Sequence, residues 1–358
     1  MLRRFVDKYG PLMASFSLML LLIVSIFLYQ VSQKSVLGQN FPIEHKAYFT
    51  DPRLKQFPPR LYVQDNRLVQ PDGASVLLKG LMAPGPIILH DKGRFTPAFY
   101  HQMRLTGANV IRIPVEPTVW ALNKEFLWRD LDPAVAWAGE QGLYVVIDWH
   151  MVGNIETGEI AGMPGKGSYP KELTFQFWKL AASYFRDTPN VLFEVFNEPN
   201  KITASEWRAN AIDLVHLIRS QGASQPILIG GIKYSTDLSW VLTDPVPGEN
   251  IAYAVHNYPS NPPEAWDAHF GDVADRYPVV MTEWGYMDEN PSKTQLFLNG
   301  NQTGYGDPLM AYTQAHQVSW IACWFDDQWE PPLFTKGYAG YTRYGQFVLE
   351  QLRQAPGP

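Results

Sequence analysis

The sequence predicts a barrel of eight parallel β-strands alternating with α-helices, preceded by a transmembrane helix and a small β-hairpin. Short apolar or β-branched segments recur eight times between residues 76 and 327. The stretches between them are long enough to hold helices, and polar side chains stand at the carboxyl end of nearly every segment. Such an alternation over about 250 residues is typical of the α/β fold called the (β/α)8 or TIM barrel.

The first element in the chain is an apolar segment over residues 12–29, which contains no charged residue and follows Arg3, Arg4 and Lys8. At about 1.5 Å per residue, a helix of this length just spans a hydrocarbon core of roughly 30 Å. We predict that residues 1–31 form a cytoplasmic stub and an uncleaved signal anchor, with a cleaved signal peptide as the alternative. Either outcome exports the rest of the chain to the periplasmic or extracellular face, by the positive-inside rule.

The next segment, residues 32–60, is predicted to be a linker, because it holds four prolines and no sustained hydrophobic period. We expect the folded domain over residues 61–355. It begins with residues 61–73, where alternating apolar residues flank Asp65 and Asn66, the pattern of a β-hairpin.

The eight predicted strands then follow in order. They cover residues 76–81, 109–115, 143–150, 190–199, 226–231, 251–258, 278–286 and 319–327. Helical patterns occupy, among others, residues 96–107, 128–142 and 204–222, each with a glycine where a helix C-cap favours one. A doubly wound sheet is the alternative, but it would need a phosphate-binding glycine loop after the first strand, and residues 81–86 do not form one.

Composition and charge exclude several functional classes. The net charge of −6 gives no electrostatic reason to bind nucleic acid. The single cysteine, Cys323, excludes an intramolecular disulfide and a cysteine-based zinc site. The 12 Trp, 18 Tyr and 19 Phe are an unusually large aromatic share, which fits an aromatic-rich core or a surface that stacks on sugar rings.

Polar side chains gather at the ends of six predicted strands. They are Arg112, His150, Asn197 with Glu198, His256 with Tyr258, Glu283, and Trp324 with Asp326 and Asp327. The carboxyl ends of barrel strands meet at one face, where barrel enzymes place their chemistry. Glu198 and Glu283 stand out. Either one alone is also explained by a salt bridge on the barrel rim, but that explanation is weaker for two glutamates that each follow an apolar strand and open onto aromatic residues.

Several motifs resemble glycoside hydrolase family 5, the cellulase family of a clan of retaining glycosidases. The two main motifs are Asn-Glu-Pro at 197–199, after the fourth strand, and Glu-Trp-Gly at 283–285, on the seventh. The further matches are Arg112 in Ile-Arg-Ile-Pro, His150 in Asp-Trp-His, His256 and Tyr258 in His-Asn-Tyr, and Trp324 on the eighth strand. Together these matches extend over the whole predicted barrel.

This resemblance implies a retaining O-glycosyl hydrolase in which Glu198 is the general acid/base and Glu283 the nucleophile. It also implies six supporting side chains. Their roles are Arg112 and Tyr258 on the Glu283 carboxylate, Asn197 on the sugar 2-hydroxyl, His150 and His256 on sugar hydroxyls or the carboxylates, and Trp324 as the floor under the cleaved sugar. We expect no cofactor and no metal. A metal site made by His150, His256 and Glu198 is the alternative, although the two-carboxylate scheme accounts for the same residues.

For the substrate we predict endo-β-1,4-glucanase action on a soluble or envelope polysaccharide. Five tryptophans near strand ends suggest an open cleft that stacks on several sugars; they are Trp120, Trp149, Trp284, Trp324 and Trp329. The glycine-rich residues 151–172 are expected to form a mobile rim of this cleft. A β-mannanase, a hydrolase of another β-glucan or exopolysaccharide, a transglycosylase and a catalytically silent glycan-binding barrel remain alternatives, and the sequence indicates no oligomeric state.

Overall fold

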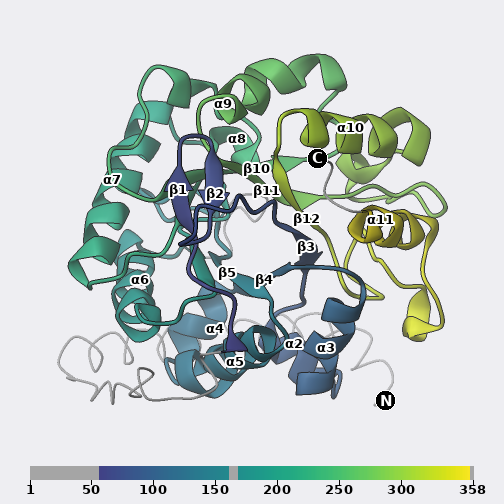
Figure 1. Cartoon of the computed structure of the whole chain (residues 1–358), viewed down its shortest axis with the longest axis horizontal. Coiled ribbons are helices and arrows are strands. Elements are labelled where there is room, and N and C mark those ends of the chain that lie inside the picture. The colour runs from purple at the N-terminus through teal and green to yellow at the C-terminus, as the bar shows by residue number, and fades with distance from the viewer. Residues whose placement is uncertain (1–55, 161–167, 355–358) are drawn as a thin grey trace, which may run out of the picture.

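The computed structural model of the chain describes residues 56–160 and 168–354, and its centre is a closed barrel of eight parallel strands (Figure 1). The strands follow one another around the barrel in chain order, and the last pairs with the first. They are β3 (Lys79–Met82), β4 (Val110–Val115), β5 (Tyr144–Trp149), β7 (Val191–Glu194), β9 (Ile227–Gly230), β10 (Ile251–Asn257), β11 (Val279–Trp284) and β12 (Ser319–Ala322). The predicted barrel is confirmed.

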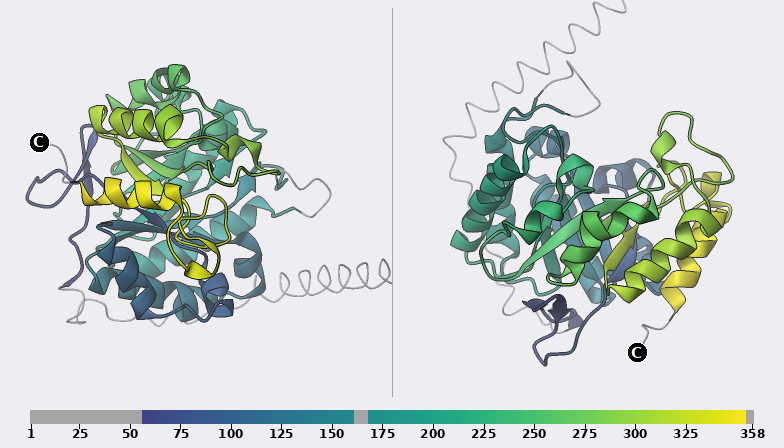
Figure 2. Two further views of the ribbon diagram at one scale, coloured as in Figure 1. Left: turned by 90° about the vertical axis from the view of Figure 1, so that its right-hand side faces the viewer. Right: turned by 90° about the horizontal axis from the view of Figure 1, so that it is seen from above.

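Helices surround the barrel on its outer side (Figures 1 and 2). They are α2 (Pro86–Asp91), α3 (Pro97–Leu105), α4 (Pro117–Leu122), α5 (Asp132–Glu140), α6 (Lys171–Phe185), α7 (Ala204–Ser220), α8 (Ile232–Ser235), α9 (Asp272–Ala274), α10 (Asp307–Ala315) and α11 (Arg343–Arg353). Local sequence fixes their ends. Helix α7, for example, begins at a capping box in which Thr203 and Glu206 satisfy each other's backbone N–H groups.

The glycines expected after three of these helices have positive φ, as a left-handed C-terminal residue requires. The angles are 104° at Gly107, 74° at Gly142 and 80° at Gly222. The first of the three also lies against backbone, because a Cβ on Gly107 would sit 2.8 Å from the carbonyl oxygen of Leu352.

Two hydrophobic clusters hold the barrel together, one inside it and one between strands and helices. On β4, Val110 belongs to the inner cluster, whereas Ile111 and Ile113 belong to the outer one. On β5, Val146 points inward and Ile147 outward. This period of two means that a polar residue two positions after an inward apolar residue also enters the barrel.

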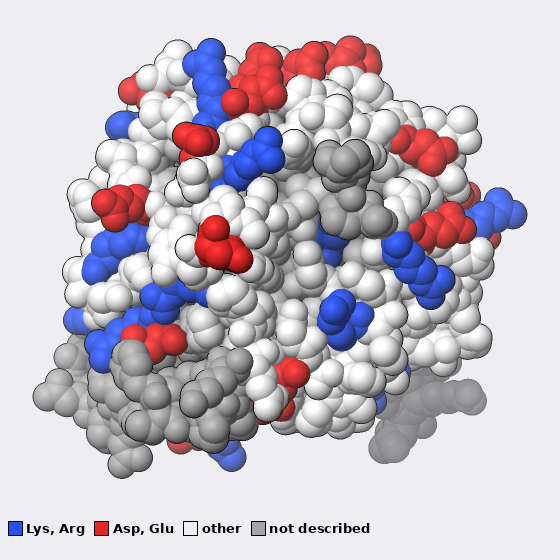
Figure 3. Space-filling view, in the orientation of Figure 1, with Lys and Arg blue, Asp and Glu red and all other residues white. Residues whose placement is uncertain are grey.

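The predicted hairpin is confirmed and covers the amino-terminal end of the barrel, opposite the loops that follow the strands (Figure 2). Strand β1 (Tyr62–Gln64) pairs antiparallel with β2 (Arg67–Val69) around a two-residue turn. Leu61 and Leu68 belong to the inner apolar cluster, so the hairpin closes this end of the barrel. Basic and acidic side chains are interspersed over most of the face that carries it (Figure 3).

Some predicted elements end earlier than the sequence pattern suggests. The predicted strand over 190–199 divides into β7 and a separate two-residue strand, β8 (Glu198–Pro199), which pairs with β6 (Val152–Gly153) outside the barrel. The predicted strand over 319–327 ends at Ala322, and the helix over 128–142 begins as a π-helical segment, Leu127–Leu131, before α5. In the two strands, burial continues beyond the backbone pairing, and periodicity alone does not distinguish the two.

The predicted signal anchor at 12–29, and all but the last five residues of the predicted linker at 32–60, lie outside the described residues. Within residues 56–160 and 168–354, no helix is both long and apolar enough to cross a membrane.

Candidate active site

A layer of polar side chains occupies the barrel interior above the apolar inner cluster. Its members come from five strands and continue the inward-facing register of the apolar residues below them. They are Arg112 on β4, Asp148 on β5, Glu194 on β7, His256 on β10, and Thr282 with Glu283 on β11. Of these, only Glu283 has any exposed surface, 6% for the residue as a whole. Charges buried this deeply must be paired, and this layer is built of such pairs.

Arg112 is the centre of this layer. Its Nε donates to Glu194 Oε2 at 2.6 Å, and its Nη1 lies 2.6 Å from Glu283 Oε1. Its Nη2 donates to Asn197 Oδ1 at 2.6 Å and lies 3.0 Å from Asp148 Oδ2. Arg112 was expected at the carboxyl end of its strand, but it lies in the middle of β4, and its long side chain carries the guanidinium up to the site.

Glu283 is held as an anion by its neighbours. Tyr258 donates its hydroxyl to Glu283 Oε2 at 2.8 Å, and His256 Nδ1 lies 3.6 Å from the same oxygen. Burial acts to raise the pKa of Glu283, but the charges of His256, Arg112 and His150 and the Tyr258 hydrogen bond outweigh burial and lower the pKa to about 2. Arg112 and Tyr258 thus both contact this carboxylate.

Glu198, on β8, lies opposite Glu283, on β11. Its side chain is 16% exposed, against 8% for Glu283, and its Oε1 lies 2.9 Å from His256 Nδ1. One carboxylate oxygen of Glu198, one of Glu283 and a ring nitrogen of His256 all lie within 4.8 Å of one another. The two glutamates that the sequence singled out are therefore brought together, with His256 between them.

The two histidines have different partners. His256 contacts both glutamates, whereas His150 Nδ1 lies 2.6 Å from Asp148 Oδ2. Burial acts to lower the pKa of His150, but the negative charge of Asp148 reverses this and raises it to about 9. The alternative metal site of His150, His256 and Glu198 does not converge, because the donor group that does converge contains Glu283 in place of His150.

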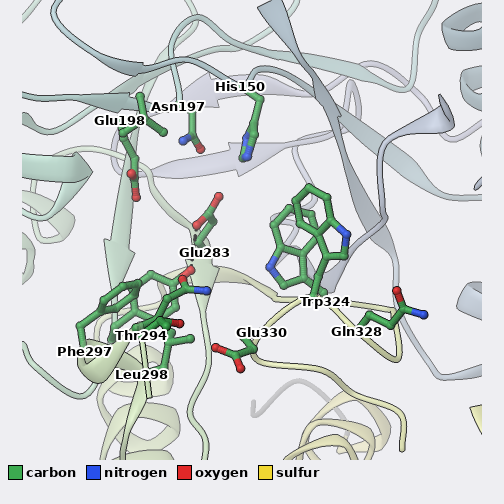
Figure 4. Close-up of a pocket in the computed structure, with 14 residues that line it drawn as sticks. His150, Asn197, Glu198, Glu283, Thr294, Phe297, Leu298, Trp324, Gln328 and Glu330 are labelled. Carbon is green, nitrogen blue, oxygen red and sulfur yellow. Dashed lines mark hydrogen bonds between the residues drawn. The ribbon is translucent and has the colours of Figure 1, made fainter. Parts of the chain in front are cut away.

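A cavity of about 480 Å³ opens at these side chains (Figure 4). Its lining residues are His150, Val152, Asn197, Glu198, Tyr258, Glu283, Thr294, Gln295, Phe297, Leu298, Trp324, Gln328, Trp329 and Glu330. Glu198 and Glu283 point into it from one side and Trp324 stands across from them (Figure 4). Trp324 and Trp329 meet with ring centroids 4.8 Å apart. Six of the eight predicted site residues thus line one cavity, and the other two, Arg112 and His256, lie beneath it and contact its lining.

The prediction that five tryptophans line a cleft is wrong for three of them. Trp120, Trp149 and Trp284 have no exposed surface and pack in the outer apolar cluster. Only Trp324 and Trp329 line the cavity. Trp149 and Trp284 lie at outward-facing positions of β5 and β11, where alternate residues point to the helices, and Trp120 lies on helix α4.

Sequence reasoning missed the buried partners of the site and one of its rims. Asp148, Glu194 and Thr282 were not singled out, although a charged or hydroxylated residue at an inward position of an apolar strand was a usable signal. The expected rim over 151–172 contributes Val152 to the lining, and its residues 161–167 lie outside the described part of the chain. The larger contribution comes from the segment after β11, residues 294–298.

Comparison with known proteins indicates the family of the chain. The family model of cellulases (glycosyl hydrolase family 5) matches residues 69–327. Endoglucanase A of Butyrivibrio fibrisolvens is 30% identical over 247 residues, which are 66% of this chain and 54% of that protein. Endoglucanase 5 of Pectobacterium carotovorum subsp. carotovorum is 24% identical over 313 residues, 82% of this chain and 57% of that protein. The chain therefore spans little more than half the length of these relatives.

Solved structures share the fold. A beta-glucanase from Saccharophagus degradans gives a TM-score of 0.80 at 23% identity and covers 88% of this chain and 98% of that one. The catalytic domain of an endoglucanase from Thermobifida fusca gives a TM-score of 0.71 at 20% identity and covers 84% of this chain and 99% of that one. At these identities the likeness shows the fold alone. The family model, however, matches well over half of the sequence, and the chain belongs to glycosyl hydrolase family 5, the cellulase family.

Proposed function

We propose that the chain is a retaining glycoside hydrolase of β-linked polysaccharide, with Glu198 as the general acid/base and Glu283 as the nucleophile. The observation that carries this proposal is the spacing of the two carboxylates, whose nearest oxygens lie within 4.8 Å. Retaining glycosidases separate the two groups by about 5–5.5 Å, whereas inverting enzymes need about 6.5–9.5 Å to admit a water molecule. Oxygens this close favour the retaining arrangement.

The reaction takes two displacements at the anomeric carbon. In the first, the Glu283 carboxylate attacks that carbon, the glycosidic C–O bond breaks, and Glu198 transfers its proton to the leaving oxygen. In the second, Glu198 removes a proton from water as the water oxygen attacks, and the bond to Glu283 breaks and restores its carboxylate. Two inversions return the original configuration. The low pKa of Glu283 supplies the anion that the first step needs.

The remaining side chains of the cavity position the sugar. The Oδ1 of Asn197 accepts a hydrogen bond from Arg112. The Nδ2 of Asn197 is then left to donate to the sugar 2-hydroxyl, a bond that strengthens in an oxocarbenium-like transition state. Trp324 is the stacking surface for the cleaved sugar, since its ring stands across from the carboxylates. His150, at the same end of the cavity, is placed to bond a sugar hydroxyl.

For the substrate, we propose endo-acting cleavage of β-1,4-glucan. The two relatives named above are described as endoglucanases, and the beta-glucanase from Saccharophagus degradans forms a complex with cellotetraose. The presence of both carboxylates argues against a silent glycan-binding barrel. A β-mannan, another β-glucan or exopolysaccharide as substrate, and transfer to a sugar in place of water, are the competing outcomes of the experiment below.

We also propose that the barrel acts outside the cytoplasm, tethered by residues 12–29. The absence of charge over this segment and the basic residues before it support the proposal. Fractionation of cells that express the full chain would test it: we expect the protein in the membrane fraction, accessible to protease from the exported side. Protein recovered in the cytoplasm would refute it.

Reducing-end release by the full chain tests the enzymatic proposal. We would compare β-1,4-glucan, mixed-linkage glucan, glucomannan and xyloglucan, each in soluble form. We expect activity on the β-1,4-glucan that falls below detection in Glu283→Gln and is unchanged in Glu125→Gln, a matched change of an exposed glutamate on the barrel exterior. Activity that survives Glu283→Gln would refute the nucleophile assignment. Activity confined to glucomannan would move the substrate to mannan, and products longer than the input would indicate transfer.

A further inference from the structure

A chain of hydrogen-bonded side chains runs behind the two carboxylates of the cavity. It passes from Glu194 through Thr282 and His256 to Glu198. Thr282 Oγ1 lies 2.7 Å from Glu194 Oε1 and 3.2 Å from His256 Nε2, and His256 Nδ1 lies 2.9 Å from Glu198 Oε1. The first three residues have no exposed surface, and only Glu198 reaches the cavity.

A β-bulge lets Thr282 and Glu283 both face the barrel interior. In an even strand Thr282 and Glu283 would point to opposite faces. The pairing of β11 with β10 shifts register between Val255 and His256, and its pairing with β12 also shifts between Met281 and Trp284. The extra residue in β11 lets both Thr282 and Glu283 face His256, at 3.2 Å and 3.6 Å. Bulges that redirect a side chain in this way are common beside active sites.

The buried end of the chain fixes the direction of its hydrogen bonds. Burial acts to raise the pKa of Glu194, but the charge of Arg112 and the hydrogen bonds to this carboxylate lower it below its usual value. Glu194 is therefore an anion that only accepts hydrogen bonds. The single proton of Thr282 is donated to Glu194, so Thr282 has only lone pairs left for His256. Nε2 of His256 must then carry a proton.

The charges that face the His256 ring determine whether it carries a second proton, on Nδ1. They are the carboxylates of Glu194 on β7, Glu198 on β8 and Glu283 on β11. Burial acts to lower the pKa of His256, but these carboxylates raise it to about 10, so the ring is an imidazolium at neutral pH. Its Nδ1–H then donates to Glu198 Oε1.

We propose that Thr282 and Glu194 are positioning residues for the acid/base carboxyl, an inference that rests on the function proposed above. Thr282 accepts from Nε2 and donates to Glu194, and these two bonds hold His256 with Nδ1–H on Glu198 Oε1. This leaves Glu198 Oε2 to carry the acid proton to the glycosidic oxygen in the first step. In the second step the same Nδ1–H bond stabilises the Glu198 carboxylate before it takes a proton from water.

A comparison of leaving groups tests this inference in the full chain. The substrates are oligosaccharides of the polymer that the wild-type chain cleaves and the 2,4-dinitrophenyl glycoside of the same sugar. Dinitrophenolate leaves without protonation, so a misplaced acid slows only the oligosaccharide reaction. For Thr282→Val we expect kcat/KM on the oligosaccharide to fall about 10-fold or more, out of the roughly 10²–10⁴-fold that general acid catalysis contributes. On the aryl glycoside we expect a change below about 3-fold, because this substrate needs no general acid.

The matched control is Thr282→Ser, which retains the hydroxyl and should bring the oligosaccharide reaction back to within about 3-fold of wild type, since the acid remains in place. Equal losses on both substrates, or no loss on either, would overturn the inference while leaving the glycosidase function standing. A wild-type chain inactive on every polymer and on the aryl glycoside would refute the glycosidase function and this inference with it.

Nitrogen-15 NMR of the histidine side chains gives a readout that needs no turnover. In the wild-type chain we expect both ring nitrogens of His256 to be protonated at pH 7, with the signal assigned by its loss in His256→Gln. Absence of an Nε2 proton signal for His256 in the wild-type spectrum would overturn the inference. This measurement can refute the inference even where Thr282→Val does not fold.

Discussion

The guanidinium of Arg112 and the carboxylate of Glu283 meet at 2.6 Å although 171 positions separate the two residues in the chain. Arg112 has no exposed surface, and two further buried carboxylates, those of Asp148 and Glu194, share its charge. Burial opposes the charged form of Arg112, but the three carboxylates hold its pKa well above the usual value. The site is therefore preorganised around one permanent positive charge.

Removing that charge should destabilise the whole barrel. We expect Arg112→Met to lower the free energy of unfolding by about 3–5 kcal/mol, because it leaves buried carboxylates without their partner. Urea denaturation measures the change. The control is Arg129→Met, which breaks an exposed pair one helical turn apart and should cost no more than about 0.5 kcal/mol. Equal stability of the two variants would contradict the picture of a charge-dependent layer.

The pH dependence of stability should report the low pKa of Glu283. Its folded pKa of about 2 lies below the value of 4.5 for an unperturbed glutamate, so its contribution is complete above pH 4.5 and disappears as the pH falls toward 2. Over this interval we expect the free energy of unfolding of the wild type to fall by on the order of 3 kcal/mol more than that of Glu283→Gln. Denaturation curves at several pH values measure this. Parallel curves for the two proteins would show that Glu283 is not an ion-paired anion in the fold.

Loss of the acid/base should be repaired by a small anion. In Glu198→Ala we expect kcat on oligosaccharides to fall by roughly 10²–10⁴-fold, the usual contribution of general acid–base catalysis. With a dinitrophenyl glycoside and added azide, we expect a β-glycosyl azide, because the anion attacks the glycosyl-enzyme from the side that Glu198 vacates. The anomeric configuration of the azide product is read by NMR. An α-azide would mean that no covalent intermediate forms.

Loss of the stacking surface should weaken substrate binding and, because Trp324 is only 6% exposed, should also lower the stability. We expect Trp324→Ala to lower kcat/KM about 10-fold, since an aromatic contact with the substrate contributes about 0.5–1.5 kcal/mol beyond its buried area. Trp128→Ala is the matched control, because Trp128 is 40% exposed and lies on the helical exterior. Steady-state kinetics with thermal unfolding distinguishes the two effects. A similar loss of activity in both variants would argue against a sugar on the Trp324 ring.

The buried partners of the site show where sequence reasoning ends. Glu198 and Glu283 were predictable because each follows an apolar strand in a short, recognisable motif. Thr282 was not singled out, because its role depends on hydrogen bonds to Glu194 and His256, which lie on strands far away in the chain. Glu194 sits inside an apolar segment, and nothing local shows that Arg112 will neutralise it.

By itself, the sequence determined the alternation of strands and helices, the end of the barrel that holds the chemistry, and the two carboxylates. These follow from local periodicity and motif, which act over a few residues. The tertiary structure alone decided which tryptophans reach the cavity, which charges share Arg112, and which way the His256 ring is held. Those outcomes depend on pairing between strands far apart in the chain, where a shift of one residue turns a side chain from the core to the site.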